Sequence, residues 1–104
     1  MSRGSHKTHL AAMAFLVATL ASACGPTHFS IHSVRASRHL AQARQMGAQE
    51  YAPYEYLVAT EHLDKAKEEA GKAEYQDAVA LAKIADEHAQ KAVQVAREAR
   101  GGER

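Results

Sequence analysis

The chain has 104 residues, with 13 lysines and arginines against 12 aspartates and glutamates and a formal charge of +1. A chain of this length forms at most one small domain, and it lacks the concentrated basic surface that nucleic-acid binding requires. Alanine dominates an apolar fraction of 46%, and a buried methyl group stabilises a fold far less than a buried leucine side chain. We therefore expect no nucleic-acid partner and a fold that depends on close helix packing.

The first part of the chain has the order of a secretory signal. A short basic start carries Arg3 and Lys7, and Leu10–Leu20 is an uninterrupted run of apolar and small side chains. At about 11 residues, this run is shorter than the roughly 20 that a permanent transmembrane helix needs. Small residues then directly precede Cys24, the sole cysteine. We predict that residues 1–23 are a cleaved export signal.

Cys24 and the small residues before it resemble the lipobox of bacterial lipoproteins, in which the cysteine is lipidated before cleavage in front of it. The resemblance implies a lipid anchor on Cys24, and Gly25 as the next residue favours the outer membrane. The usual leucine three residues before the cysteine is replaced by Ala21, and ordinary soluble secretion would cut at the same bond. We favour lipidation, because it consumes a lone thiol that is otherwise prone to intermolecular pairing in an oxidising compartment.

We predict an all-α domain over residues 33–100, in which helix-breaking residues separate the helices. Ser33 is a candidate cap for a first helix, and Pro53 suits the first turn of a second. Gly71 is expected to end the second helix in a left-handed conformation. We expect a lipid-anchored tether at residues 24–32 and a flexible tail at residues 101–104. Between them, three helices are expected at Ser33 to about Ala48, at Pro53 to Ala70, and at about Glu74 to Arg100.

Alanines in the third predicted helix alternate spacings of four and three, which is the pattern of a continuous helix-packing seam. The second predicted helix has small and apolar residues in a matching register. We therefore predict an antiparallel hairpin with its tip at Gly71 and with the first helix alongside. An alanine zipper between chains, as in the trimeric murein lipoprotein, needs one long helix, and Pro53 and Gly71 argue against it. The two seams are Ala78, Ala82, Ala85, Ala89, Ala92, Ala96 and Ala99, and Tyr56, Ala59, Leu63, Ala66 and Ala70.

Histidines are the residues that suggest metal chemistry. His28 and His32 have the i, i+4 spacing that places two ligands on one helix face, but no third ligand lies nearby in the sequence. His88 falls one step off the alanine seam, so we expect it to be partly buried and hydrogen-bonded at the edge of two helices. His62 is expected to be exposed.

Tyrosines are the candidate partner surface. Tyr51, Tyr54 and Tyr56 cluster around Pro53, and Tyr75 lies at the opposite end of the predicted hairpin. Aromatic clusters often anchor interfaces, because they bury a large area with few rotamers. The same rings also suit the ends of a thin alanine core, where they would fill gaps.

Two motifs and the alanines that follow them resemble the family of domain of unknown function 4398. The motifs are GAQEYAP at residues 47–53 and EYQDA at residues 74–78, and the alanines are those of the third predicted helix. The resemblance covers about residues 31–100. It implies an alanine-rich helical module of bacterial envelope lipoproteins, often followed by an OmpA-like peptidoglycan-binding domain. We expect no such domain in this protein, so peptidoglycan binding is not carried over.

Together these features predict a non-catalytic, lipid-anchored helical module of the bacterial cell envelope, facing the periplasm and acting structurally or as an adaptor. We expect an envelope protein or a second copy as partner, the membrane as a lipid contact, and no cofactor or small-molecule substrate. An enzyme is not expected, because an alanine core leaves little room for a substrate cavity. The alternative is a small periplasmic metal-binding protein that uses His28 and His32.

Overall fold

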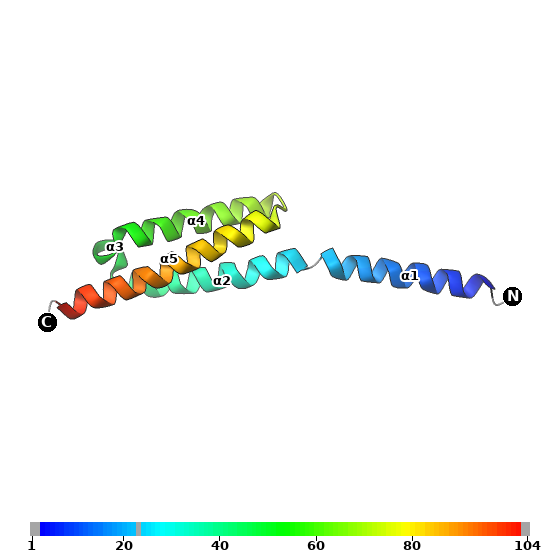
Figure 1. Ribbon diagram of the computed structural model, residues 1–104, viewed down its shortest axis with the longest axis horizontal. Helices are drawn as coiled ribbons and strands as arrows, with labels where there is room; N and C mark the ends of the chain where they lie inside the picture. The colour runs from blue at the N-terminus through cyan, green and yellow to red at the C-terminus, as the bar shows by residue number, and fades with distance from the viewer. Residues whose placement is uncertain (1–2, 23, 103–104) are drawn as a thin grey trace.

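The computed structural model describes residues 3–22 and 24–102, and every element in those ranges is an α-helix (Figure 1). The predicted all-α class is therefore confirmed. The helices are α1 (Arg3–Ser22), α2 (Cys24–Gln45), α3 (Ala48–Tyr51), α4 (Pro53–Gly71) and α5 (Tyr75–Gly102).

α5 lies between α2 and α4, and α1 extends away from the bundle (Figure 1). α2 and α5 run in the same direction, since Gly25 lies beside Tyr75 and His39 contacts Asp86 further along. α4 runs antiparallel to both and is joined to α5 by a short turn. The bundle is therefore formed by α2 to α5 without α1.

Alanine forms most of the buried core. The larger buried apolar side chains are Leu40, Leu63 and Val93, between 4% and 8% exposed. Small side chains allow helix backbones to approach closely, so this core gains its stability from close packing rather than from bulk. Ala99, the last member of the predicted seam, is half-buried. The alanines with no exposed surface are Ala36, Ala43, Ala48, Ala59, Ala66, Ala78, Ala82, Ala85, Ala89, Ala92 and Ala96.

Residues on the two sides of the alanine stripe of α5 face different helices. On one side, Asp86 contacts His39 of α2, and Val93, seven residues later, packs in a cluster with Ala43 of α2. On the other side, His88 contacts Glu55 of α4. The central position of α5 therefore gives it a buried face that is wider than one seam.

Residues 24–32 are helical, and the predicted tether and Ser33 cap are wrong. α2 begins at Cys24 and continues without a break to Gln45. Pro26 lies in the first turn, where backbone N–H groups have no partner within the helix and proline is tolerated. The contact between Gly25 and Tyr75 also places this segment against α5.

The link from α2 to α4 also differs from the prediction of one helix ending near Ala48. α2 ends at Gln45, and Gly47 has a left-handed conformation with a φ of 81°. The short helix α3 follows, and Pro53 occupies the start of α4, as its fixed φ predicts. The described domain therefore has a fourth, short helix between the predicted first and second helices.

The turn between α4 and α5 uses an alanine where glycine was expected. Gly71 belongs to α4, while Ala73 has the positive φ of 61°. The backbone N–H of Glu74 donates to the carbonyl of Glu69 at 2.9 Å, which is the longer bond of a Schellman-type helix end. The prediction of a left-handed Gly71 is therefore wrong. α5 also continues to Gly102, so residues 101 and 102 are helical; residues 103 and 104 lie outside the described residues.

Candidate functional site

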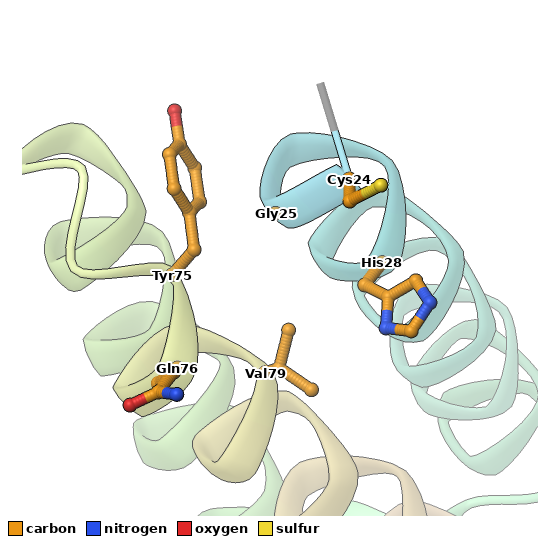
Figure 2. A pocket seen from close by; sticks show the side chains of 6 residues that line it. All are labelled: Cys24, Gly25, His28, Tyr75, Gln76 and Val79. Carbon is orange, nitrogen blue, oxygen red and sulfur yellow. The ribbon is translucent and has the colours of Figure 1, made fainter. Parts of the chain in front are cut away.

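Cys24 is exposed on the first turn of α2, at the end of the bundle where α5 begins. A pocket of about 290 Å³ lies beside it, between the first turns of α2 and α5 (Figure 2). The sulfur of Cys24 points away from Tyr75 (Figure 2), and the residue as a whole is exposed. The pocket is lined by Cys24, Gly25, His28, Tyr75, Gln76 and Val79.

A close contact between Gly25 and Tyr75 forms one wall of this pocket. A Cβ atom added to Gly25 would lie 3.0 Å from Cδ2 and 3.1 Å from Cγ of the Tyr75 ring. Real Cβ atoms essentially never approach closer than the first of these distances. The absence of a side chain at Gly25 therefore lets the ring pack directly on the backbone next to Cys24.

The two predicted metal ligands lie in different surroundings. His28 is exposed at the pocket, whereas His32 is half-buried. Burial lowers the pKa of His32, and the positive charges of Lys83 and Arg35 lower it further. In residues 3–22 and 24–102, no three side chains of histidine, cysteine, aspartate or glutamate are grouped to hold a metal ion. The structure thus adds no third ligand to His28 and His32.

The first of two buried carboxylates is Asp86, at the interface of α5 with α2. It is 6% exposed and accepts a hydrogen bond from Nδ1 of His39 at 2.5 Å. Nε2 of Gln90 donates to its second oxygen at 3.1 Å, and Nε of Arg35 lies 3.7 Å from that oxygen. Asp86 is therefore compensated by two helices at once.

Glu55 is the second buried carboxylate, at the interface of α4 with α5. It is 9% exposed and accepts a hydrogen bond from Nδ1 of His88 at 2.5 Å, while Nζ of Lys91 lies 3.1 Å from its other oxygen. Burial alone raises the pKa of Glu55, but the bonds from His88 and Lys91 outweigh it and lower the pKa overall. The prediction that His88 is partly buried and hydrogen-bonded is confirmed.

The sequence pattern did not predict that the carboxylates of Glu55 and Asp86 are buried. Glu55 falls in the first turn of the second predicted helix, where a negative charge is favourable without any burial, although it lies four residues before the buried Ala59. Asp86 lies seven residues before Val93, and this spacing places both on the side of α5 that faces α2. The signal for Asp86 exists in the sequence, but it is visible only once α5 is known to have two neighbours.

The comparisons with known proteins concern these same helices. Residues 34–103 match the family described as Domain of unknown function (DUF4398). The chain belongs to this family. No curated protein and no solved structure matches the chain.

Both buried carboxylate pairs of this DUF4398 chain lie within the matched residues, whereas Cys24 and its pocket wall on α2 lie before them. The family's helices therefore carry the charged contacts between α2, α4 and α5. The first turn of α2 belongs to a segment that the family match does not include.

The four predicted tyrosines do not form one surface in this DUF4398 chain. Tyr51 and Tyr56 are half-buried and pack on the core, and Nε of Arg44 donates to the Tyr56 hydroxyl at 3.0 Å. Tyr54 is 69% exposed, and its ring is nearly perpendicular to that of His88 (79°) at a centroid distance of 6.4 Å. Tyr75 lies at the other end of α4 and α5, against Gly25. Tyr54 is therefore the member of the set that is open to a partner.

His62 is half-buried, so the prediction that it is exposed is wrong. Its Nδ1 donates to the carbonyl of Val58 at 2.8 Å, and its ring stacks on His88 at a centroid distance of 6.4 Å. The stack brings His62 of α4 beside His88, the residue that contacts Glu55. His62 thus belongs to the helix interface rather than to the solvated face.

Proposed function

We propose that this protein is a non-catalytic, lipid-anchored helical module of the bacterial cell envelope, with a structural or adaptor role. The observation that carries the proposal is the contrast between α1 and the bundle. Every side chain described for residues 5–19 is exposed, including Leu10 at 68% and Phe15 at 73%. The buried core lies in α2 to α5. An apolar helix whose described side chains are all exposed suits a membrane or an export machinery rather than water.

The composition of this helix supports the same proposal. The stretch from Ser5 to Gln45 includes a window with a mean hydropathy of 1.6 and no buried residue, and by length and composition alone it could cross a membrane. A signal sequence near an N-terminus has the same properties. We infer that residues 1–23 serve export and are removed, because cleavage before Cys24 leaves the alanine hairpin of α4 and α5 and its contact with α2 intact.

The proposed mature protein starts at an exposed Cys24, which fits attachment of the lipid that retains it on the membrane. We favour the outer membrane, with the bundle facing the periplasm. The carboxylate–histidine pairs are engaged between helices, Glu55 with His88 and Asp86 with His39, which supports a structural rather than a catalytic use.

An adaptor role is supported by the outer face of α4. Tyr54 and Leu57, three residues apart, are 69% and 55% exposed. An aromatic and an aliphatic side chain on one helix turn suit the centre of a modest protein interface. We propose an envelope protein or a second copy of the chain as the partner.

Lipid attachment at Cys24 tests the proposal. We expect the protein, expressed in a bacterium, to incorporate labelled palmitate and to enter the detergent phase of a Triton X-114 partition, and Cys24→Ser to lose both properties. A Cys24→Ser/Ser30→Cys variant is the matched control, because it restores a thiol to α2 outside the small-residue context. Unlabelled wild-type protein that remains in the aqueous phase would contradict lipid anchoring.

The adaptor role has its own test. A photo-crosslinking amino acid at Tyr54 is expected to give a discrete adduct with an envelope protein or a second copy in intact cells. The same substitution at Lys67, an exposed polar position of α4, is the control and should give none. A folded, anchored protein that forms no adduct from position 54 would contradict the proposed partner surface.

A further inference from the structure

The contact between Gly25 and Tyr75 links the proposed lipid-attachment site to the turn between α4 and α5. We propose that this end of the bundle, formed by Cys24, Gly25 and residues 72–75, rests on the lipid headgroups as a second membrane contact and holds the bundle upright. We call it the membrane-facing end. The inference rests on the proposed lipidation of Cys24, and it adds the surface that contacts the membrane and the orientation of the domain.

No flexible segment separates Cys24 from the bundle. α2 is one helix of 22 residues from Cys24 to Gln45. At 1.5 Å per residue, it carries the chain about 33 Å away from the anchored end. A lipid on Cys24 is therefore attached to the end of a rigid rod rather than to a loose leader.

The turn between α4 and α5 lies at the same end of the bundle as Cys24. The Tyr75 ring packs on the backbone of Gly25, where an added Cβ would lie 3.0 Å from the ring. Lys72, Ala73 and Glu74 immediately precede Tyr75 and are all exposed. Two separate parts of the chain thus reach the membrane-facing end, and a second support restricts the tilt that a single anchor would allow.

Tyr75 gives the membrane-facing end chemistry that suits a lipid headgroup layer. Tyr75 is half-buried, and its hydroxyl points away from Val79 and the body of the bundle (Figure 2). A ring with an apolar body and a polar tip suits the headgroup layer of a bilayer. The pocket between Cys24 and Val79 opens beside this ring.

Charge decides which lipid surface fits. Glu74 and Asp77 are exposed near Tyr75, while Nζ of Lys72 is 3.3 Å from Glu68 and 3.5 Å from Glu69. Lys65 also pairs with Glu68 and Glu69, so these two glutamates are balanced by two lysines. Glu74 and Asp77 remain as an acidic excess, and anionic lipids would repel this end. The fitting surface is a zwitterionic headgroup layer, such as phosphatidylethanolamine or phosphatidylcholine.

The orientation can be measured on the lipidated mature protein, which after export starts at Cys24. Single cysteines replace Lys72 at the membrane-facing end or Gln49 in α3 at the far end, and each carries a nitroxide spin label. Lipidation consumes Cys24, so the introduced thiol is the one that reacts. In phosphatidylcholine vesicles with a small fraction of a paramagnetic headgroup-chelate lipid, we expect several-fold greater relaxation enhancement at position 72 than at position 49.

Tyr75 variants test the contact itself. Tyr75→Ala should bring the ratio of the two enhancements towards one, whereas Tyr75→Phe, which keeps the ring, and Tyr54→Ala, which alters a distant tyrosine, should preserve it. Palmitate incorporation in the same preparation separates the two proposals. A lipidated protein with equal enhancement at both positions, or with an unchanged ratio in Tyr75→Ala, would overturn the upright orientation alone. A protein without lipid would contradict the proposed function and this inference with it.

Discussion

Two buried carboxylates shape this small bundle at the scale of single residues. Burying an ionised carboxylate is costly unless a charged or hydrogen-bonding partner compensates it. Asp86 and Glu55 each have a histidine within 2.5 Å on a neighbouring helix. Removing one partner of a buried pair typically costs about 3–5 kcal/mol, because it leaves the other charge uncompensated. The pairs therefore favour one register of α5 against α2 and α4, which an alanine seam alone specifies weakly.

The pH dependence of folding should follow Glu55 on the acid side. Its folded-state pKa lies below the ordinary value of 4.5, so the unfolded chain binds more protons than the folded protein in acid. The stabilisation is therefore present above about pH 4.5 and is lost as the pH falls through the lower folded-state pKa. We expect Glu55→Gln to reduce the free energy of unfolding by about 1.5–3 kcal/mol at pH 7 and to weaken its decline below pH 4.5.

Urea titrations followed by circular dichroism at several pH values measure this effect. Glu61→Gln removes an exposed carboxylate from the same helix and serves as the matched control, with little expected change. Equal unfolding midpoints for Glu55→Gln and the control at pH 7 would show that the Glu55 pair does not hold α4 to α5.

At the scale of elements, periodicity predicted α4 and α5 better than it predicted α2 and the turns. The alternating spacings of the α5 alanines correspond to a buried stripe from Ala78 to Ala96. The start of α2 was not predictable locally, because its first turns pack through a glycine on a tyrosine 50 residues away, Gly25 on Tyr75. The prediction of the turn after α4 was wrong in detail. The preference of glycine for a positive φ pointed to Gly71, whereas the residue with a positive φ is Ala73.

Substitution by alanine should change the free energy of unfolding differently at Gly47 and at Gly71, two glycines at helix ends. Gly47 has a φ of 81°, and an added Cβ would lie 3.1 Å from Cδ2 of Tyr51, so Gly47→Ala should lower the free energy of unfolding by about 1–2 kcal/mol. Gly71 is helical with no atom within 4 Å of an added Cβ, so Gly71→Ala should be neutral or stabilise by up to about 1 kcal/mol. Thermal unfolding of the pair measures both effects. Destabilisation by Gly71→Ala would indicate that the left-handed residue lies at Gly71 after all.

The whole molecule combines a bundle that packs its own core with an apolar helix that does not join it. This division was visible in the sequence, because the apolar run from Leu10 to Leu20 ends shortly before Cys24. The charged contacts between helices were not visible, because Asp86 and Glu55 gain their partners only when α5 is placed between two neighbours. Patterns along one helix predict which face is buried, but not which of two helices each side of that face meets.

The central claim is that the mature protein begins at a lipidated Cys24. Intact-mass and peptide mass spectrometry of the protein purified from bacterial membranes tests it most directly. We predict an N-terminal peptide that starts at Cys24 and carries the added mass of a diacylglyceryl group, with residues 1–23 absent. An N-terminal peptide that retains α1, or one that starts at an unmodified Cys24, would contradict the claim.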